Sequence, residues 1–265
     1  MPCPDIVADL ERFPDKISVV NAGSLHLQYN PEGKILSCID TDLGEAYYHA
    51  ADVGQLPDYE ICTPMRMLFN WSCAMHGVLM VHAAAVGKHG IGALIVGKSG
   101  AGKSTTALQC LLNGLDYLGD DYVAVNSDDG TVHHLYRGCK VMDDALERLP
   151  VLAPHVIMHN RPNRKSVVIL DDTLGALVPS FRLVAIIRPR VAKAAGSNFS
   201  PLSPRQAVAE FAASTILQMP GTGSYMLREL SKLCARVSAF EMSLSTEPAE
   251  IAQALDDFLQ QYSTT

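Results

Sequence analysis

The sequence predicts an α/β fold built around a glycine-rich loop, with a small β-rich part at the N-terminus. Short alternating stretches separated by turns fill residues 1–60. Apolar segments of strand and helix length alternate over residues 61–265. Within them, the apolar stretch ALIVG at 93–97 leads into the glycine-rich loop, and a helical segment follows. We therefore expect two parts, residues 1–60 and residues 61–265, the second long enough for a sizeable core.

The first elements follow from turn residues between apolar stretches. KISVV and SLHLQYN predict two strands around the turn NAG, and NPEGK predicts a second turn before ILSCI. A helix is expected over residues 63–77, because Thr63 can cap it and Pro64 suits its first turn. The segment VLMVHAAAVGKHGIGALIVG then predicts two strands joined at GKHG, where Gly87 and Gly90 supply the turn.

The remaining elements alternate between strand and helix. A helix is expected from about Lys103 to Leu112, ended by Gly114. DYLGDDYVAVNSDDGTVHHLY predicts strands on both sides of an aspartate pair, MDDALERLPVLA a short helix, and KSVVIL and RLVAIIRP two strands. Ser203 caps the next helix and Pro204 opens it. RVSAFEMSL predicts a late strand, and EPAEIAQALDDFLQQY predicts the terminal helix.

Charge and cysteine content argue against several classes of protein. The formal net charge of −7 disfavours a nucleic-acid binder, which normally carries a basic face. The seven cysteines are odd in number and none pair at metal-ligand spacing, so we expect reduced thiols and neither a disulfide framework nor a zinc site. No apolar run has the length of a membrane span, and the acidic, proline-broken start is not a signal peptide. We expect a cytoplasmic protein that binds neither nucleic acid nor membranes.

The glycine-rich loop, GKSGAGKS at 97–104, matches G-x-x-x-x-G-K-[ST] at every fixed position. Its glycines let successive N–H groups point at phosphate oxygens, and the following helix N-terminus adds partial positive charge. Lys103 would reach the β and γ phosphates, and the Ser104 hydroxyl would bind Mg²⁺. The motif therefore predicts ATP and Mg²⁺ as ligands. The residues expected to contact the nucleotide are Gly97, Lys98, Ser99, Gly100, Ala101, Gly102, Lys103, Ser104 and Thr105.

Two adjacent aspartates, Asp120 and Asp121, follow soon after the loop. Neighbouring carboxylates beside a polyphosphate repel each other unless a cation or a proton neutralises them. Mg²⁺ can do so, and one carboxylate can then accept a proton from an attacking hydroxyl. A surface turn such as SDDG at 127–130 is the alternative, but the apolar flanks DYL and YVAV favour a functional site.

The segment MVHAAAVGKHGIGALIVGKSGAGKSTTALQCLLNGLDYLGDD resembles the catalytic core of the HPr serine kinase/phosphorylase family. The resemblance consists of a histidine before the phosphate loop, the loop itself, and an aspartate pair after a helix that ends in NG. It is close from His82 to Val125 and looser to about residue 240. The resemblance implies a P-loop α/β fold of the HPr-kinase C-terminal-domain type, related to phosphoenolpyruvate carboxykinase, for residues 61–265.

The same resemblance implies catalytic roles for single residues. His82 matches the family's active-site histidine, and Lys103 would hold the phosphates. Asp120 matches the carboxylate that accepts the proton, and Asp121 matches its metal-associated neighbour. Arg188, in IIRPR, falls near a functional arginine of the family, although the surrounding family pattern is missing.

The chain also departs from the bifunctional enzymes of this family. Thr105 stands where those enzymes usually have Glu, and their long signature segment and N-terminal domain are not found. The chain is more similar to shorter HPr-kinase-like proteins, several of which resemble lasso-peptide precursor kinases. The resemblance therefore implies a kinase that phosphorylates a serine of a peptide or protein, which could be a lasso-peptide precursor. Basic residues at Arg164, Lys165, Arg188 and Arg190 would steer this acceptor.

Alternatives to this prediction stay open. A small-molecule kinase could use the same core, and an enclosed pocket beside Asp120 would favour it over an open groove for a peptide. A nucleotide-dependent switch or ATPase without a transfer substrate is the other alternative. An ATP-binding-cassette protein is disfavoured, because the signature LSGGQ is missing. Members of the family often assemble into oligomers, so the resemblance also allows a homo-oligomer.

Overall fold

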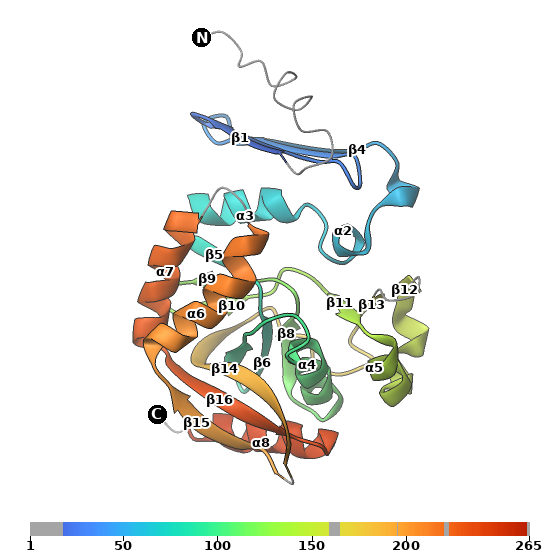
Figure 1. Cartoon of the computed structure of the whole chain (residues 1–265), viewed down its shortest axis with the longest axis vertical. Coiled ribbons are helices and arrows are strands. Elements are labelled where there is room, and N and C mark those ends of the chain that lie inside the picture. Colours follow the sequence, from blue (N-terminus) through green and yellow to red (C-terminus); the bar gives the residue numbers. More distant parts are fainter. Residues whose placement is uncertain (1–17, 159–164, 195, 220–222, 264–265) are drawn as a thin grey trace.

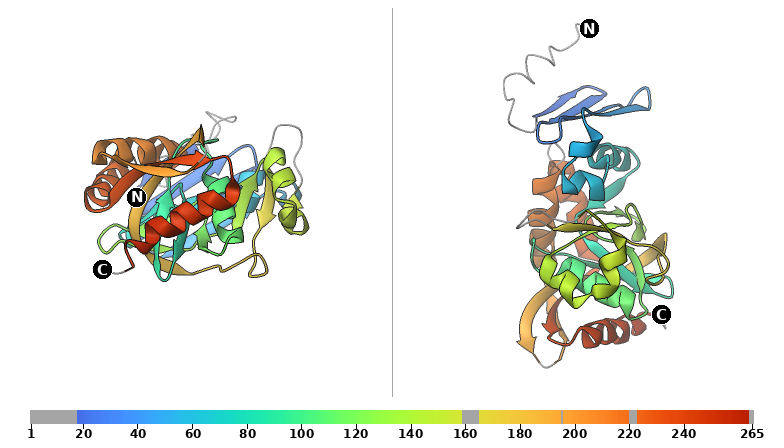
Figure 2. Two further views of the ribbon diagram at one scale, coloured as in Figure 1. Left: turned by 90° about the horizontal axis from the view of Figure 1, so that it is seen from below. Right: turned by 90° about the vertical axis from the view of Figure 1, so that its right-hand side faces the viewer.

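The structure, a computed structural model, describes residues 18–158, 165–194, 196–219 and 223–263. It is an α/β fold with three sheets, and helices pack around the large sheet (Figures 1 and 2). The N-terminal sheet lies at one end, the large mixed sheet lies in the middle, and the small third sheet lies beside it. In the described part of the chain, no helix combines the length and the apolar character needed to cross a membrane.

The N-terminal sheet contains four consecutive antiparallel strands, of which the last was not predicted. They are β1 (Ser18–Ala22), β2 (Leu25–Asn30), β3 (Ile35–Asp40) and β4 (Glu45–Ala50). Side chains of β3 alternate between buried and half-buried, as a strand with one covered face requires. Ile39 packs against Met67 and Trp71 of the following helix, so this sheet is joined to the main body through apolar contact.

A helix forms within the predicted residues 63–77 but is shorter than expected, and a second helix, which the sequence did not predict, forms just before it. After the short turn η1 (Val53–Gln55), α2 spans Asp58–Cys62 and α3 spans Arg66–Met75. Met65 separates them with a left-handed φ of 56°, a conformation that cannot continue a right-handed helix. Thr63 therefore ends α2, where its hydroxyl donates to the carbonyl of Tyr59, and it does not cap α3.

The large sheet is mixed, with the strand order β5-β9-β10-β14-β7-β6-β8 and with β16 and β15 joined through β14. Only the pairs β7–β14 and β14–β16 are parallel among the described strands. Its strands are β5 (Val78–Val81), β6 (Ala84–Lys88), β7 (Ile91–Ile95), β8 (Asp116–Gly119), β9 (Val123–Asn126), β10 (Thr131–His133), β14 (Ser180–Ala194), β15 (Asn198–Leu202) and β16 (Ser238–Ser245).

Three strands, and not the predicted two, form from the segment before the phosphate loop. β5 pairs with β9, whereas β6 and β7 form the hairpin, so the connection at His82 lies between two separate parts of the sheet. The hairpin turn uses His89 and Gly90, with φ of 53° and 78°. Gly87 instead lies inside β6, where an added Cβ would approach the Phe181 ring to 2.9 Å. Gly87 therefore permits close packing and does not form the turn.

Helices cover both faces of the large sheet, because successive strand residues point to opposite sides. Ile95 and Ile187 pack with α4 and α8, whereas Leu94 and Ile186 pack with α3, α6 and α7. The third sheet has the order β11-β13-β12. Its strands are β11 (Gly138–Val141), β12 (Val156–Met158) and β13 (Ser166–Ile169). The remaining helices are α4 (Lys103–Leu112), α5 (Asp143–Arg148), η2 (Pro150–His155), α6 (Pro204–Thr215), η3 (Ile216–Gln218), α7 (Gly223–Arg236) and α8 (Pro248–Gln260).

Candidate active site

The phosphate loop connects the C-terminal end of β7 to the N-terminus of α4. Gly97, Gly100 and Gly102 have φ of 143°, 81° and 96°, conformations that side chains other than glycine rarely adopt. Lys103 begins α4 and is buried, and its Nζ donates to the Gly97 carbonyl at 2.8 Å. Burial lowers the pKa of Lys103, although Asp120 and Asp121 counteract this shift. The loop thus holds a buried ammonium group among inward-curled backbone.

Asp120 and Asp121 follow β8 and are both buried. Asp121 has a left-handed φ of 61°, which turns the chain sharply between β8 and β9. Neither carboxylate oxygen of Asp120 has a hydrogen-bond partner among the described residues. Burial and the neighbouring Asp121 charge raise the pKa of Asp120, and the nearby Ser104 hydroxyl offsets part of this rise. Asp120 therefore presents free oxygens beside the serine of the phosphate loop.

Asp121, in contrast, has three partners. The Lys140 ammonium lies 3.1 Å from Oδ2, and His82 Nε2 lies 3.6 Å from Oδ1. The Cys62 thiol donates to Oδ2 with a sulfur–oxygen distance of 3.6 Å. Burial alone would raise the pKa of Asp121, but His82 and Lys140 hold it well below its usual range. The environments of the two adjacent carboxylates therefore push their pKa values in opposite directions.

His82 lies where the sequence predicts it, next to the aspartate pair. Its position is fixed by the connection between β5 and β6, where its backbone N–H donates to the Thr215 hydroxyl at 3.1 Å. Its ring packs against the Tyr122 ring, with 5.2 Å between centroids. The Nδ1 atom is buried and has no hydrogen-bond partner in the described part of the chain. The structure thus brings together His82, Asp120, Asp121, Lys103 and Ser104.

Two residues of this site, Lys140 and Cys62, are missing from the sequence-based prediction. Lys140 comes from β11, and Cys62 ends α2 in the segment that connects the N-terminal sheet to the main body. The close approach of α2 to β11 requires Gly138, since a Cβ there would lie 2.6 Å from the Cys62 carbonyl oxygen. Nothing in the local sequence marks these contacts, because they join segments far apart in the chain.

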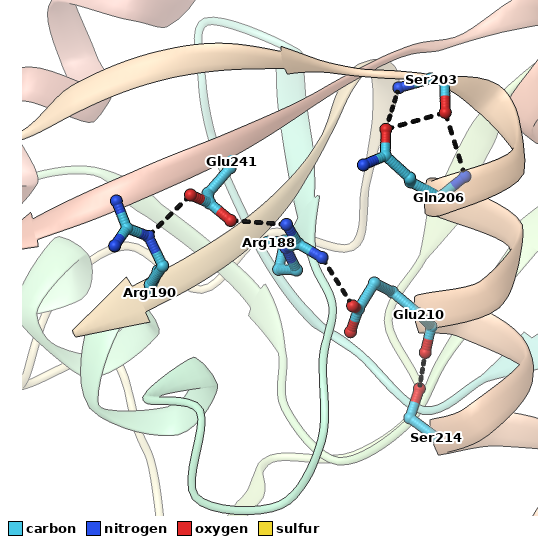
Figure 3. A network of polar contacts seen from close by, with 7 residues as sticks. All are labelled: Arg188, Arg190, Ser203, Gln206, Glu210, Ser214 and Glu241. Carbon is cyan, nitrogen blue, oxygen red and sulfur yellow. Dashed lines mark hydrogen bonds and ion pairs between the residues drawn. The ribbon is translucent and has the colours of Figure 1, made fainter. Parts of the chain in front are cut away.

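Arg188 lies near the loop, but its side chain is occupied by two carboxylates (Figure 3). Its strand neighbour Ile187 pairs with Ile95, immediately before the loop. Arg188 Nη1 donates to Glu210 at 2.8 Å and Nη2 donates to Glu241 at 2.5 Å. Glu241 also accepts from Arg190 at 2.6 Å. The described contacts therefore tie Arg188 to α6 and β16, and its predicted catalytic role stays a prediction. Arg164, another predicted acceptor contact, lies outside the described residues.

A cavity of about 840 Å³ opens in front of the loop. Its lining combines loop residues, lysines and apolar side chains of α5 and α8, a mixture that suits phosphates and a base in one ligand. The lining includes Lys103 and Ser104 of the loop together with Lys140 and Lys165. Together with the unpartnered oxygens of Asp120 beside Ser104, this cavity fits ATP and Mg²⁺.

No family model matches the chain. Two curated relatives are the HPr kinase/phosphorylases of Bacillus licheniformis, 45% identical over 56 residues, and of Geobacillus thermodenitrificans, 45% identical over 49 residues. These matches cover 21% and 18% of this chain and 16% of each relative, so the chain matches only a small part of their length.

One solved structure, the Hpr(Ser) kinase/phosphatase from Coxiella burnetii, overlaps with a TM-score of 0.35 and 10% identity. The overlap covers 70% of this chain and 96% of that one, but so loose a superposition carries no structural argument. The support comes from the curated relatives, which share nearly half of their residues with this chain over the matched segment. Over about a fifth of its length, the chain is confirmed to resemble the HPr kinase/phosphorylase family.

Proposed function

We propose that this protein is an ATP- and Mg²⁺-dependent kinase that transfers the γ-phosphoryl group to a serine hydroxyl of a peptide or protein. The observation that carries this proposal is the unequal aspartate pair at the phosphate loop. Asp120 has free oxygens beside Ser104, whereas Asp121 is held by His82 and Lys140. Phosphoryl transfer to a hydroxyl needs these two kinds of carboxylate, one for the metal and one for the proton.

The donor phosphates would bind to the loop between β7 and α4. The loop amides and the N-terminus of α4 provide hydrogen bonds and partial positive charge. The Lys103 ammonium, now held by the Gly97 carbonyl, would bind the β and γ phosphates. Mg²⁺ would neutralise charge on the same phosphates. The unpartnered carboxylate and the serine hydroxyl beside it support this assignment, because Mg²⁺ prefers oxygen ligands.

The geometry favours exchanging the roles that the sequence resemblance implies for the two aspartates. The Ser104 hydroxyl lies near enough to Asp120 to lower the pKa of its carboxyl, so we assign Asp120 with Ser104 to Mg²⁺. Asp121 lies against His82, and we assign it to the acceptor hydroxyl. In the transfer, the serine oxygen bonds to the γ phosphorus while the bond from that phosphorus to the bridging oxygen breaks. The electron pair of that bond leaves with ADP, and the hydroxyl proton, which becomes strongly acidic as its oxygen bonds to phosphorus, passes to the Asp121 carboxylate.

A peptide or protein as the phosphate acceptor is inferred mainly from the curated relatives, and less from the basic residues that were expected to attract it. The relatives' name, HPr kinase/phosphorylase, describes a kinase that acts on a protein. Of the four basic residues expected to steer a peptide, Arg188 and Arg190 are already paired with Glu241. Lys165 lines the cavity and could still meet an acidic acceptor. A lasso-peptide precursor is one acceptor of this class, and a small-molecule hydroxyl is the alternative that the 840 Å³ cavity allows.

A labelling experiment tests this function. The purified protein is incubated with Mg²⁺ and ATP labelled at the γ-phosphate, separately with a library of serine peptides and with a panel of hydroxylated metabolites. We expect label on peptide serine, located by mass spectrometry, and none with Lys103→Ala. Labelled metabolites with unlabelled peptides would favour the small-molecule kinase. Release of free phosphate alone would indicate an ATPase.

A further inference from the structure

Lys140 lies at the boundary between the buried aspartate pair and the open cavity. Its Nζ is 3.1 Å from Asp121 Oδ2, and its side chain is only 18% exposed. The same side chain lines the cavity in front of the phosphate loop, together with Lys103 and Ser104. Its backbone is fixed in the third sheet, where it pairs with Val167 of β13. Lys140 can therefore contact a cavity ligand without any movement of its strand.

The cavity carries more positive charge than the loop motif alone supplies. Lys103, Lys140 and Lys165 all line it. The positive charges of Lys140 and Lys165 lower the pKa of Lys103 further, beyond the effect of burial. Each of two ammonium groups already contacts a protein oxygen. Lys103 contacts a loop carbonyl, and Lys140 contacts the Asp121 carboxylate. An incoming phosphate oxygen can replace such a partner, because it accepts the same charged hydrogen bond.

We propose that Lys140 is a second phosphate-binding lysine, which exchanges the Asp121 carboxylate for the γ-phosphoryl group when ATP binds. This inference rests on the proposed function. The exchange makes an Asp121 oxygen available to the acceptor hydroxyl only when a transferable phosphate is present. With ADP in the site, the ammonium stays on the carboxylate. Lys140 would thus distinguish ATP from ADP and couple donor binding to the exposure of Asp121.

A purely structural ion pair is the competing explanation, and the chain offers a matched control for it. Lys88 Nζ lies 2.5 Å from Asp256 Oδ2, and the two side chains are 30% and 12% exposed. This pair joins β6 to α8 and is absent from the cavity lining. Removing either lysine breaks a partly buried ion pair, but only Lys140 faces the proposed phosphate site.

The test measures the affinity of the full chain for a non-hydrolysable ATP analogue and for ADP by calorimetry. The variants are Lys140→Gln, Lys140→Arg, Lys88→Gln and Asp121→Asn, each first checked by thermal melting. We expect Lys140→Gln to lose about tenfold in affinity for the ATP analogue, as for a hydrogen bond between charged groups, and less than twofold for ADP. Lys140→Arg should retain part of the preference for ATP, and Lys88→Gln all of it. Asp121→Asn should bind the ATP analogue more tightly, because the competing carboxylate charge is gone.

The outcomes separate this inference from the function on which it rests. Equal losses for the ATP analogue and ADP in Lys140→Gln, or an unchanged preference, would overturn the exchange. If Lys140→Gln does not fold, weaker binding of the ATP analogue by Asp121→Asn overturns it instead. Absence of nucleotide binding by the wild-type chain would reject the proposed function itself.

Discussion

Replacing the two adjacent aspartates by asparagine should change stability in opposite directions. Asp120 is buried, and its oxygens lack hydrogen-bond partners among the described residues. A buried polar group without a partner costs about 1–3 kcal/mol, and more when it is charged. Asn removes the charge but keeps the shape, so we expect Asp120→Asn to raise the free energy of unfolding by about 1–2 kcal/mol. The same substitution should strongly slow phosphoryl transfer at low Mg²⁺, which would mark Asp120 as retained for function.

Asp121→Asn should instead destabilise the fold. At 3.1 Å, an effective dielectric constant near 20 gives a gross attraction to Lys140 of about 5 kcal/mol. Part of this is recovered when the lysine regains water, since its side chain is 18% exposed. We therefore expect a net loss of about 3 kcal/mol, the lower end of values for breaking a buried ion pair.

Urea denaturation at pH 7, followed by circular dichroism, measures both changes against the wild type. The pH dependence provides a second measurement. The raised pKa of Asp120 means that its charge destabilises the native state above that pKa, so the advantage of Asp120→Asn should shrink as the pH falls toward about 4. Asp121 has a lowered pKa, so its contribution is present above about 4 and is lost as the pH falls further. If both substitutions change the free energy of unfolding at pH 7 in the same direction, the two aspartates do not have the opposite effects on stability that are inferred here.

Three further predictions concern the loop, the arginine and the packing of α2. Lys103→Ala should reduce phosphoryl transfer at least a hundredfold, since losing one charge partner of the transition state costs about 3 kcal/mol; normal turnover of the folded variant would remove the loop from the mechanism. Arg188→Gln should lower the free energy of unfolding by about 1–3 kcal/mol, because Glu210 loses its ion-pair partner and Glu241 keeps only Arg190. Nucleotide affinity should stay within twofold, and a large loss of affinity in calorimetry would instead support a role of Arg188 at the nucleotide site. Gly138→Ala should lower the free energy of unfolding by about 1–3 kcal/mol, because the added Cβ would lie 2.6 Å from the Cys62 carbonyl oxygen. In the control Gly223→Ala, the nearest atom to the added Cβ is 3.5 Å away. Equal melting temperatures for the two variants would contradict the packing of α2.

Sequence patterns are sufficient where the chemistry is local. The phosphate loop depends on fixed spacing over eight residues, and the cap of α6 depends on Ser203 and Gln206, which form the reciprocal hydrogen bonds of a capping box. The hairpin of β6 and β7 depends on its turn, although His89 takes the left-handed position expected for Gly87. The break at Met65 escaped prediction because a left-handed methionine has no sequence signature.

The contacts that distinguish the two aspartates depend on tertiary structure and could not be predicted. Cys62 and Asp121 are separated by 59 residues, and Lys140 comes from a strand of a different sheet. The left-handed backbone at Asp121 gives the neighbouring carboxylates different surroundings. The resemblance to a family identifies the pair, but only the folded arrangement shows which carboxylate faces Ser104 and which faces His82.

The most direct test of the account is the rate of phosphate transfer in a single turnover as Mg²⁺ is raised. Wild type, Asp120→Asn and Asp121→Asn are compared with γ-labelled ATP and a serine peptide that the wild type phosphorylates. High Mg²⁺ should partly restore transfer in Asp120→Asn, because Asp120 is assigned to the metal with Ser104. Asp121→Asn should stay two to four decades slower at every Mg²⁺ concentration, because it lacks the proton acceptor. Rescue of Asp121→Asn alone, or normal transfer by either variant without added Mg²⁺, would contradict the account.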